Sequence, residues 1–333
     1  MLVSIIIPLY NVNKYIDSIV SNINIQTYKN IEVIFVDDGS TDGTLEMLKH
    51  KKINVNNVIY LQQENSGPSV ARNKGLDVAQ GEYIVFWDAD DYVSEKAIED
   101  LVGAIKNNDL GMITIFMRFI NNEKIVDNKL SIDMFQNNND FKESFAHLLS
   151  TNHMYAIPLW NKIYKKDIIH KYHIKFCEGL SWSEDLDWNV QYYNYVNNWG
   201  LEKNSGYYYC IRKNNENLSR KYDSKNIFTL YKTLNKMLMC VENRQMSYKE
   251  FCYMWCIKNA VSNIANVFRN KNVCFFANVK FIKKYFFNEL YAWCKNAKAQ
   301  NIYEKILLLC IKNRFKNGIV MIAYVIHIVR EFR

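Results

Sequence analysis

This 333-residue sequence lacks the motifs that define several well-known protein classes. Its eight cysteines form no Cys-x-x-Cys pair, and no histidine lies near Cys252 and Cys256 in sequence. We therefore expect reduced, buried thiols rather than a zinc site or a disulfide framework. Neither Gly-x-Gly-x-x-Gly nor Gly-x-x-x-x-Gly-Lys-Ser/Thr occurs, which gives little support to a dinucleotide-binding or P-loop protein.

The sequence also has no apolar run long enough to cross a bilayer. Its last apolar run, residues 319–329, falls well short of the roughly 20 residues that a spanning helix needs. The amino terminus lacks the positive region and the cleavage site of a signal peptide, and residues 3–7 indicate a buried strand instead. These features predict a cytoplasmic protein.

Negative charge is scarce in the last third of the chain. Residues 1–220 hold 22 basic and 28 acidic residues, a net of −6, whereas residues 221–333 hold 20 and 6, a net of +14. The basic tail should therefore bind an anionic partner. Because zinc-finger spacing and basic-region heptads are absent, we do not expect this partner to be a nucleic acid, and we favour an anionic membrane surface. Residues 319–329 then form either a helix in the membrane interface or a buried terminal helix. A homodimer through the C-terminal helices also stays open.

The first 120 residues alternate between strand-like and helix-like patterns. Short β-branched runs predict strands, and apolar residues at helical spacing predict the helices between them: strands at 3–7, 31–36, 58–61, 83–87 and 111–116, helices at 11–24, 69–79 and 94–105. Ser40, Thr41 or Asp42 is expected to cap a further helix through Leu45 and Leu48. This alternation predicts an α/β domain with a mainly parallel sheet. Ligands of such sheets bind beyond the carboxyl ends of the strands.

The rest of the chain divides near residue 222. Residues 121–139 are rich in asparagine and predict a surface loop, and the chain is rich in aromatic residues from Tyr155 to Tyr209. After about residue 226 the pattern is almost wholly helical. We therefore predict one domain over 1–222, in two halves (about 1–120 and about 121–222), followed by a basic helical domain over 223–333.

Acidic residues gather directly after two of the predicted strands. In Asp88-Ala89-Asp90, the two carboxylates project to the same side of an extended backbone, which suits Mg²⁺ or Mn²⁺. Such triplets also occur in solvated turns, and Asp91 is a candidate cap for the next helix. Asp38, in Asp37-Asp38-Gly39-Ser40, is able to accept a hydrogen bond from a nucleobase or a ribose. Helix capping is the simpler alternative for this second cluster.

Two further groups complete the candidate chemistry. Arg72 follows a predicted loop and is suited to a phosphate, although pairing with a local acid is the default for such an arginine. Glu184 and Asp185 lie beside Trp182, and neighbouring carboxyl groups near aromatic rings raise each other's pKa by repulsion and desolvation. A carboxyl group with a raised pKa suits a general base.

These motifs, in this order, resemble the family 2 glycosyltransferases with the nucleotide-diphospho-sugar transferase (GT-A) fold. The matching segments cover about residues 1–220: Ser4–Asn11, Val36–Asp42, Ala71–Gly75, Asp88–Asp91 and Glu184-Asp185. The resemblance implies a nucleobase between Pro8 and Tyr10, with its uracil edge on Asp38, and Arg72 near the nucleotide. It also implies Asp88 on the ribose or a metal-bound water and Asp90 on a Mn²⁺ or Mg²⁺ ion. Asp185 would be the general base, with Glu184 orienting it or the acceptor. Residues 1–222 would then form a catalytic domain, with a nucleotide-sugar half (about 1–120) and an acceptor half (about 121–222).

The resemblance extends to the acceptor side and to the reaction. Trp160, Lys162 and Trp182 are expected to face the acceptor, and Arg220 to approach a diphosphate. The Gln-x-x-Arg-Trp motif and membrane spans of processive synthases are absent. The implied enzyme is therefore inverting and non-processive. It would move a hexose or N-acetylhexosamine from a UDP-sugar to a lipid-diphosphate-linked oligosaccharide in capsule or exopolysaccharide synthesis, at the inner face of the cell membrane. The alternatives are a sugar nucleotidyltransferase and a catalytically degenerate scaffold subunit.

Overall fold

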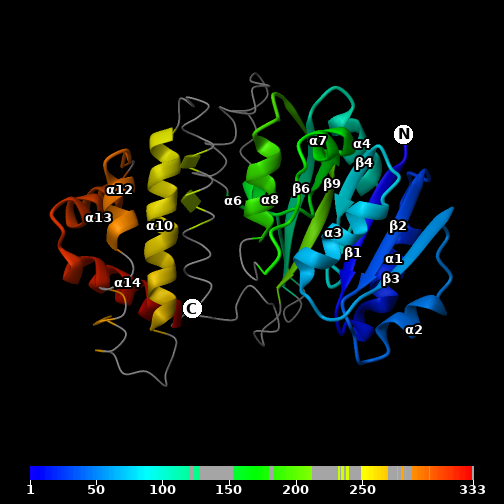
Figure 1. The fold of residues 1–333 in the computed structure, drawn as a ribbon, viewed down its shortest axis with the longest axis horizontal. Coiled ribbons are helices and arrows are strands. Elements are labelled where there is room, and N and C mark those ends of the chain that lie inside the picture. Colours follow the sequence, from blue (N-terminus) through cyan, green and yellow to red (C-terminus); the bar gives the residue numbers. More distant parts are fainter. Residues whose placement is uncertain are drawn as a thin grey trace. The chain divides into compact units, whose positions relative to one another are not determined.

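The computed structural model describes residues 1–119, 124–127, 153–179, 184–211, 249–268, 287–299 and 301–331, with isolated positions between 232 and 282. Two compact units make up the chain (Figure 1). The first combines Met1–Ser144 with Met154–Leu218, and the second combines Phe145–His153 with Ser219–Arg333. Trp182 and Arg220 lie outside the described residues.

The first unit is built on a nine-stranded sheet whose amino-terminal half is parallel. Strands β1 (Val3–Leu9), β2 (Ile31–Asp37), β3 (Asn57–Gln62) and β4 (Tyr83–Phe86) lie in the order β3-β2-β1-β4. Most of their residues are buried, as the β-branched runs predict for strands covered on both faces. The parallel order brings the carboxyl ends of β1, β2 and β4 to one edge of the sheet.

The second half of the sheet mixes strand directions. Strand β8 (Lys162–Lys165) pairs antiparallel with both β4 and β6 (Leu110–Phe119). Strand β9 (Trp199–Ile211) runs parallel to β6 and antiparallel to β5 (Tyr92–Val93), and β7 (Lys124–Asp127) pairs with β6. The predicted α/β class is confirmed, with the parallel order concentrated in β1–β4 and antiparallel strands added beyond them.

Helices flank the sheet on both faces (Figure 1). They are α1 (Ile16–Asn24), α2 (Thr44–Lys49), α3 (Pro68–Val78), α4 (Ala97–Ile105), α6 (His153–Ala156), α7 (Lys166–Lys171) and α8 (Glu184–Tyr193). Helix α3 approaches β1 closely at Gly75, where a Cβ atom would lie 2.5 Å from Cγ2 of Ile6. This contact fixes the position of Arg72 on α3 relative to the sheet.

The expected start of the helix after β2 is wrong by a few residues. Helix α2 begins at Thr44, and Asp42 Oδ1 accepts hydrogen bonds from the Thr44 backbone N–H at 3.1 Å and from its hydroxyl. Ser40 and Thr41 instead contact Asn11 across the sheet edge: Asn11 N–H donates to the Ser40 hydroxyl, and Thr41 N–H donates to Asn11 Oδ1, each at 2.9 Å. Ser40 and Thr41 therefore join the segments that follow β1 and β2 instead of capping a helix.

The second unit is helical. Helix α10 (Lys249–Val267) packs against α12 (Phe287–Cys294) and α14 (Lys316–Glu331), and α13 (Ile302–Lys312) packs against α12 and α14 (Figure 1). The buried carboxylate of Glu304 pairs with Lys258 at 2.8 Å, which ties α13 to α10. Among the described residues, no helix combines the length and the apolar character that a membrane span requires.

Candidate active site

The turn after β4 carries Asp88, Asp90 and Asp91, and the last of these anchors it. Asp91 is buried, and its carboxylate accepts hydrogen bonds from the Tyr207 hydroxyl (2.9 Å) and from the backbone N–H of Cys210 (2.8 Å) on β9. Burial, together with Asp90 and Asp88, raises the pKa of Asp91. Helix α4 begins with Lys96 at its N-cap, so the expected capping role of Asp91 is wrong.

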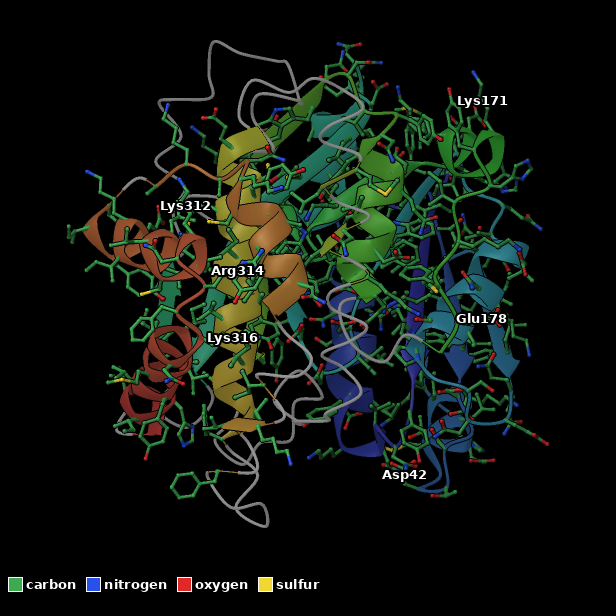
Figure 2. The ribbon with its side chains drawn as sticks, turned by 60° about the vertical axis from the view of Figure 1, so that its left-hand side comes forward. Asp42, Lys171, Glu178, Lys312, Arg314 and Lys316 are labelled. Carbon is green, nitrogen blue, oxygen red and sulfur yellow. The ribbon has the colours of Figure 1, made fainter. Side chains whose placement is uncertain are left out.

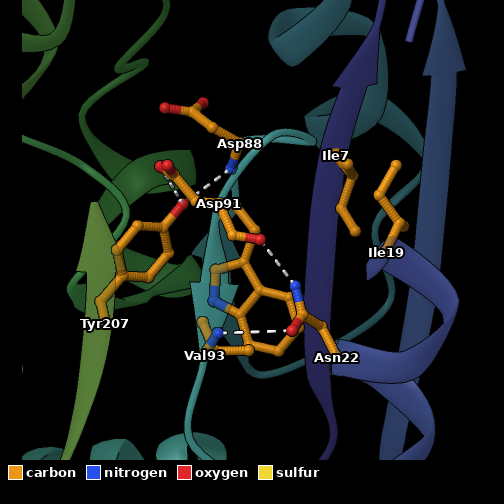
Figure 3. Close-up of a pocket in the computed structure, with 8 residues that line it drawn as sticks. Ile7, Ile19, Asn22, Asp88, Asp91, Val93 and Tyr207 are labelled. Atoms are coloured by element: carbon orange, nitrogen blue, oxygen red, sulfur yellow. Dashed lines mark hydrogen bonds between the residues drawn. The ribbon is translucent and has the colours of Figure 1, made fainter. Parts of the chain in front are cut away.

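Neighbouring elements hold the backbone of this turn from two sides (Figure 3). The Tyr207 hydroxyl accepts a hydrogen bond from the backbone N–H of Asp88 at 3.2 Å. From α1, the Asn22 amide donates to the carbonyl of Asp91 at 2.9 Å and accepts from Val93 N–H at 3.4 Å. Sequence reasoning missed this role for both Asn22 and Tyr207, because neither residue belongs to an acidic or glycine-rich motif.

The remaining acids of the turn face solvent in part. The Asp88 side chain is 31% exposed, and Asp90 is half-buried. Figure 3 shows the Asp88 carboxylate beyond the Tyr207 hydroxyl, directed away from Asn22. In the part of the chain that the structure describes, no three His, Cys, Asp or Glu side chains form a cluster able to hold a metal ion. A Mg²⁺ or Mn²⁺ ion takes only one or two protein carboxylates when phosphates and water complete its shell.

Arg72 joins this turn to the start of α8. Its Nη2 atom lies 3.1 Å from Asp88 Oδ1, and its Nη1 atom lies 3.4 Å from Asp185 Oδ1 and 3.5 Å from Glu184 Oε1. The guanidinium is buried and lies 5.5 Å from the ring of Phe176. Burial alone would lower the pKa of Arg72, but the three carboxyl groups outweigh it and raise that pKa. One cation thus holds together acids that are about a hundred residues apart in sequence.

The surroundings of Asp185 raise the pKa of its carboxyl group. Burial raises the pKa of its carboxyl group to about 8, and repulsion by Glu184 and Asp88 acts in the same direction. Arg72 and Lys162 oppose this shift, because each positive charge favours the ionised form of Asp185. The direction agrees with the effect of desolvation and neighbouring acids inferred from the sequence.

The two described residues expected on the acceptor side are buried. The Trp160 ring stacks on Tyr207 with ring centroids 4.3 Å apart, and so supports the residue that anchors the β4 turn. Lys162 is fully buried, and its ammonium donates to the carbonyl of Pro158 and to Asn161 Oδ1. Burial lowers the pKa of Lys162 to about 7, against the attraction of Asp185. Direct contact of either side chain with an acceptor stays a prediction.

The expected nucleobase region lies at the ends of β1 and β2. Tyr10 is about half exposed, and Pro8 is partly buried on β1. Asp38 is buried, and its carboxylate accepts hydrogen bonds of 2.8 Å from the Gln63 side chain and from the backbone N–H groups of Ser66 and Gly67. Asp38 therefore holds the loop that leads into α3, a role that sequence reasoning missed.

Comparison with known structures identifies the class of fold. The crystal structure of TarS residues 1–349 from S. aureus in complex with UDP-GlcNAc matches with a TM-score of 0.68 at 20% identity, covering 99% of this chain and 92% of that chain. A mannosyltransferase from Pyrobaculum calidifontis in complex with GDP-Man and Mn²⁺ matches with a TM-score of 0.53 at 14% identity, covering 99% and 86%. The fold is that of the GT-A transferases.

Sequence comparison places the chain within that class. The model of glycosyl transferase family 2 matches residues 4–172, and the chain belongs to this family. The glycosyltransferase GlyA of Streptococcus pneumoniae is 30% identical over 72% of this chain and 35% of its own length. The poly(ribitol-phosphate) beta-N-acetylglucosaminyltransferase TarS of Staphylococcus aureus is 28% identical over 68% and 38%. The chain thus spans little more than a third of the length of these two relatives.

Proposed function

We propose that this chain transfers a hexose or N-acetylhexosamine from a UDP-sugar to a hydroxyl group, with inversion and one sugar per acceptor. The observation that carries the proposal is the single cluster formed by Asp88, Arg72, Glu184 and Asp185. In this cluster, Asp88 at the carboxyl end of β4 and Asp185, whose pKa is raised, contact the same guanidinium. In a displacement at the anomeric carbon, the diphosphate leaves on one side and the acceptor hydroxyl attacks on the other. The proposal places Asp88 on the side of the diphosphate and Asp185 on the side of the hydroxyl.

The donor is proposed to bind along the ends of β1, β2 and β4. Tyr10 offers an exposed ring for a nucleobase, with Pro8 behind it, and Asp38 keeps lone pairs beyond its three protein donors for the uracil edge. Arg72 borders the nucleotide and Asp88 the ribose. The complexes of TarS with UDP and with UDP-GlcNAc support a uridine nucleotide as the donor. The GT-A catalytic domain is proposed to span residues 1–222.

The β4 turn offers two carboxylates to a divalent cation. Asp88 is 31% exposed there, and Asp90 is half-buried on the same turn. Oxygen donors of this kind suit Mn²⁺ or Mg²⁺ rather than zinc. We assign Asp90 as the direct ligand and Asp88 as a ligand of the ion or of its water. When bound, the ion would supply positive charge for the departing diphosphate.

Asp185 is proposed to act as the general base. Its carboxylate accepts the proton of the acceptor hydroxyl while that oxygen forms a bond to the anomeric carbon. The bond from the anomeric carbon to the diphosphate oxygen breaks with its electron pair, and UDP departs. One displacement inverts the anomeric centre, so an α-linked donor gives a β-glycoside. Arg72 and Glu184 position Asp185 through the contacts described above.

The acceptor is proposed to be a lipid-diphosphate-linked oligosaccharide of capsule or exopolysaccharide synthesis. The charge of +14 over residues 221–333 favours a peripheral position on an anionic membrane, at the cytoplasmic face. Trp160, Lys162, Trp182 and Arg220 stay assigned to the acceptor half, and a dimer through the C-terminal helices remains compatible with the helical unit.

Release of UDP tests the proposal. The chain is incubated with UDP-glucose, UDP-galactose or their N-acetyl forms, with Mn²⁺ or with EDTA. We expect UDP from one donor, with Mn²⁺ only, and loss of that release in Asp90→Asn. A sugar nucleotidyltransferase would instead release pyrophosphate from UTP and a sugar phosphate. A degenerate scaffold would release neither, and either result would contradict the proposal.

A further inference from the structure

Helix α13 exposes a line of large apolar side chains. Ile302, Ile306 and Leu309 are 49–72% exposed. Their spacing of four and three residues places them on one face of the helix, whereas Leu307 and Ile311 are buried among the other helices of the unit. The helix is therefore apolar on the face that packs and also on a face that meets solvent.

Helix α14 repeats this arrangement. Met321, Val325 and Ile328 have the same four-and-three spacing and are 36–67% exposed, whereas Ile319 and Ala323 are buried. Helix α14 therefore packs on α10 and α13 through one face and exposes another. Repeated exposure of large apolar residues along two successive helices is unusual for a surface that meets only water.

Every exposed charge between residues 302 and 329 is positive. The basic residues are Lys305, Lys312, Arg314 and Lys316, and Figure 2 labels the last three at the turn from α13 to α14. The only acid of this segment, Glu304, is buried and paired with Lys258. Phe315, also well exposed, lies within the basic turn.

We propose that the α13–α14 surface docks on an anionic lipid bilayer. We define this surface as the apolar lines Ile302, Ile306, Leu309 and Met321, Val325, Ile328, the turn residue Phe315 and the four basic residues Lys305, Lys312, Arg314 and Lys316. Apolar faces flanked by Lys and Arg are typical of helices that lie in the membrane interface. Because a second copy would present the same four cations, like charges disfavour self-association through this surface.

The inference rests on the peripheral membrane association proposed above, and not on the transfer chemistry. Sedimentation of the 333-residue chain with vesicles tests it. We expect binding to vesicles of phosphatidylcholine with phosphatidylglycerol, weakened by salt, and little binding to phosphatidylcholine alone. Ile306→Ser with Val325→Ser should weaken this binding roughly tenfold. Ile25→Ser, which alters an apolar residue of similar exposure in the first unit, should leave it unchanged.

Charge is tested in the same way. Lys312→Gln with Lys316→Gln should also cost roughly tenfold in affinity for the anionic vesicles, whereas Lys49→Gln with Lys52→Gln should cost much less. Thermal unfolding of each variant confirms that it folds. Vesicle binding that neither pair of α13–α14 substitutions weakens would overturn the inference.

A second result would also overturn it. If light scattering showed a dimer that Ile306→Ser with Val325→Ser dissociates, and no vesicle bound, the surface would be a contact between copies. Release of UDP in the absence of vesicles separates this inference from the transfer proposal. A chain that binds vesicles without releasing UDP would contradict only the transfer reaction, whereas one that releases UDP but binds no vesicle would contradict only the docking surface.

Discussion

Asp38 and Asp88 follow two parallel strands of the same sheet, yet their carboxylates have different kinds of partner. After β2, Asp38 accepts three hydrogen bonds from neutral N–H groups and holds the loop before α3. After β4, Asp88 shares the guanidinium of Arg72 with Asp185 and Glu184. The neutral donors of Asp38 fix a loop, whereas the single positive charge of Arg72 lies among three carboxyl groups and does not balance them all. The hydrogen-bond and ion-pair partners of these carboxylates thus distinguish them better than their common position at strand ends.

Replacing Asp185 should produce the largest effect. In Asp185→Asn, transfer should fall roughly 10²- to 10⁴-fold because no group accepts the acceptor proton. The affinity for UDP with Mn²⁺ should stay nearly unchanged, as calorimetry would show. Asp77→Asn, which removes an exposed acid from α3, serves as the control for lost charge. Transfer at a substantial rate in Asp185→Asn would contradict the assignment of the base.

Removing the shared cation should be the next largest effect. In Arg72→Met, the carboxyl groups of Asp88, Glu184 and Asp185 face one another without a positive charge. We expect the free energy of unfolding to fall by about 3 kcal/mol, measured in urea. Arg72→Lys keeps the charge and should recover part of this loss. Equal stability of Arg72→Met and the unaltered chain would show that the guanidinium does not hold the cluster together.

At the β2 end, we expect a smaller effect on stability. Asp38→Asn leaves one acceptor oxygen for three donors, so the free energy of unfolding should fall by about 1–3 kcal/mol. The affinity for UDP should fall as well if Asp38 also binds the uracil edge. Calorimetry at a temperature where the variant is folded separates the two roles. A loss of stability with unchanged UDP affinity would assign Asp38 to the loop alone.

The smallest predicted effect is a shift in pH dependence. Because the ionised form of Asp185 is the active base, kcat/KM should be low in acid and rise to a plateau as the pH passes about 8. Lys162 favours that ionised form only while it is protonated, and its own pKa of about 7 leaves it mostly neutral at this pH, so Lys162→Met should move the midpoint only slightly upward. Lys165→Met, whose lysine pairs with Asp109, should not move it. A flat profile between pH 6 and 9 would contradict titration of Asp185 in the reaction.

The sequence predicted the parallel half of the sheet better than the mixed half. Short β-branched runs bounded by polar turns identify β1, β2 and β4, because most residues of these strands are buried. Strand β8 is four residues long and gives no comparable signal, and its antiparallel place between β4 and β6 depends on contacts far away in sequence.

The candidate site also combines residues that local sequence predicts with residues that only distant contacts bring together. The acids at residues 88, 90, 184 and 185 stand out by local pattern and by resemblance to a family. Arg72, the common partner of Asp88, Glu184 and Asp185, was expected near a phosphate or paired with a local acid. Only the packing of α3 on β1 brings it between acids from two distant segments. Tyr207 and Asn22, from distant elements, each fix the β4 turn through two hydrogen bonds, and local sequence does not encode such pairings.

The location of Mn²⁺ tests the central claim most directly. Crystals of the chain grown with UDP and Mn²⁺ would show the ion by its anomalous scattering. The account predicts a peak about 2.1 Å from a carboxylate oxygen of Asp90 and from the UDP diphosphate, on the side of the β4 turn that faces Asp185. A peak bound elsewhere, with UDP lying away from this turn, would contradict it.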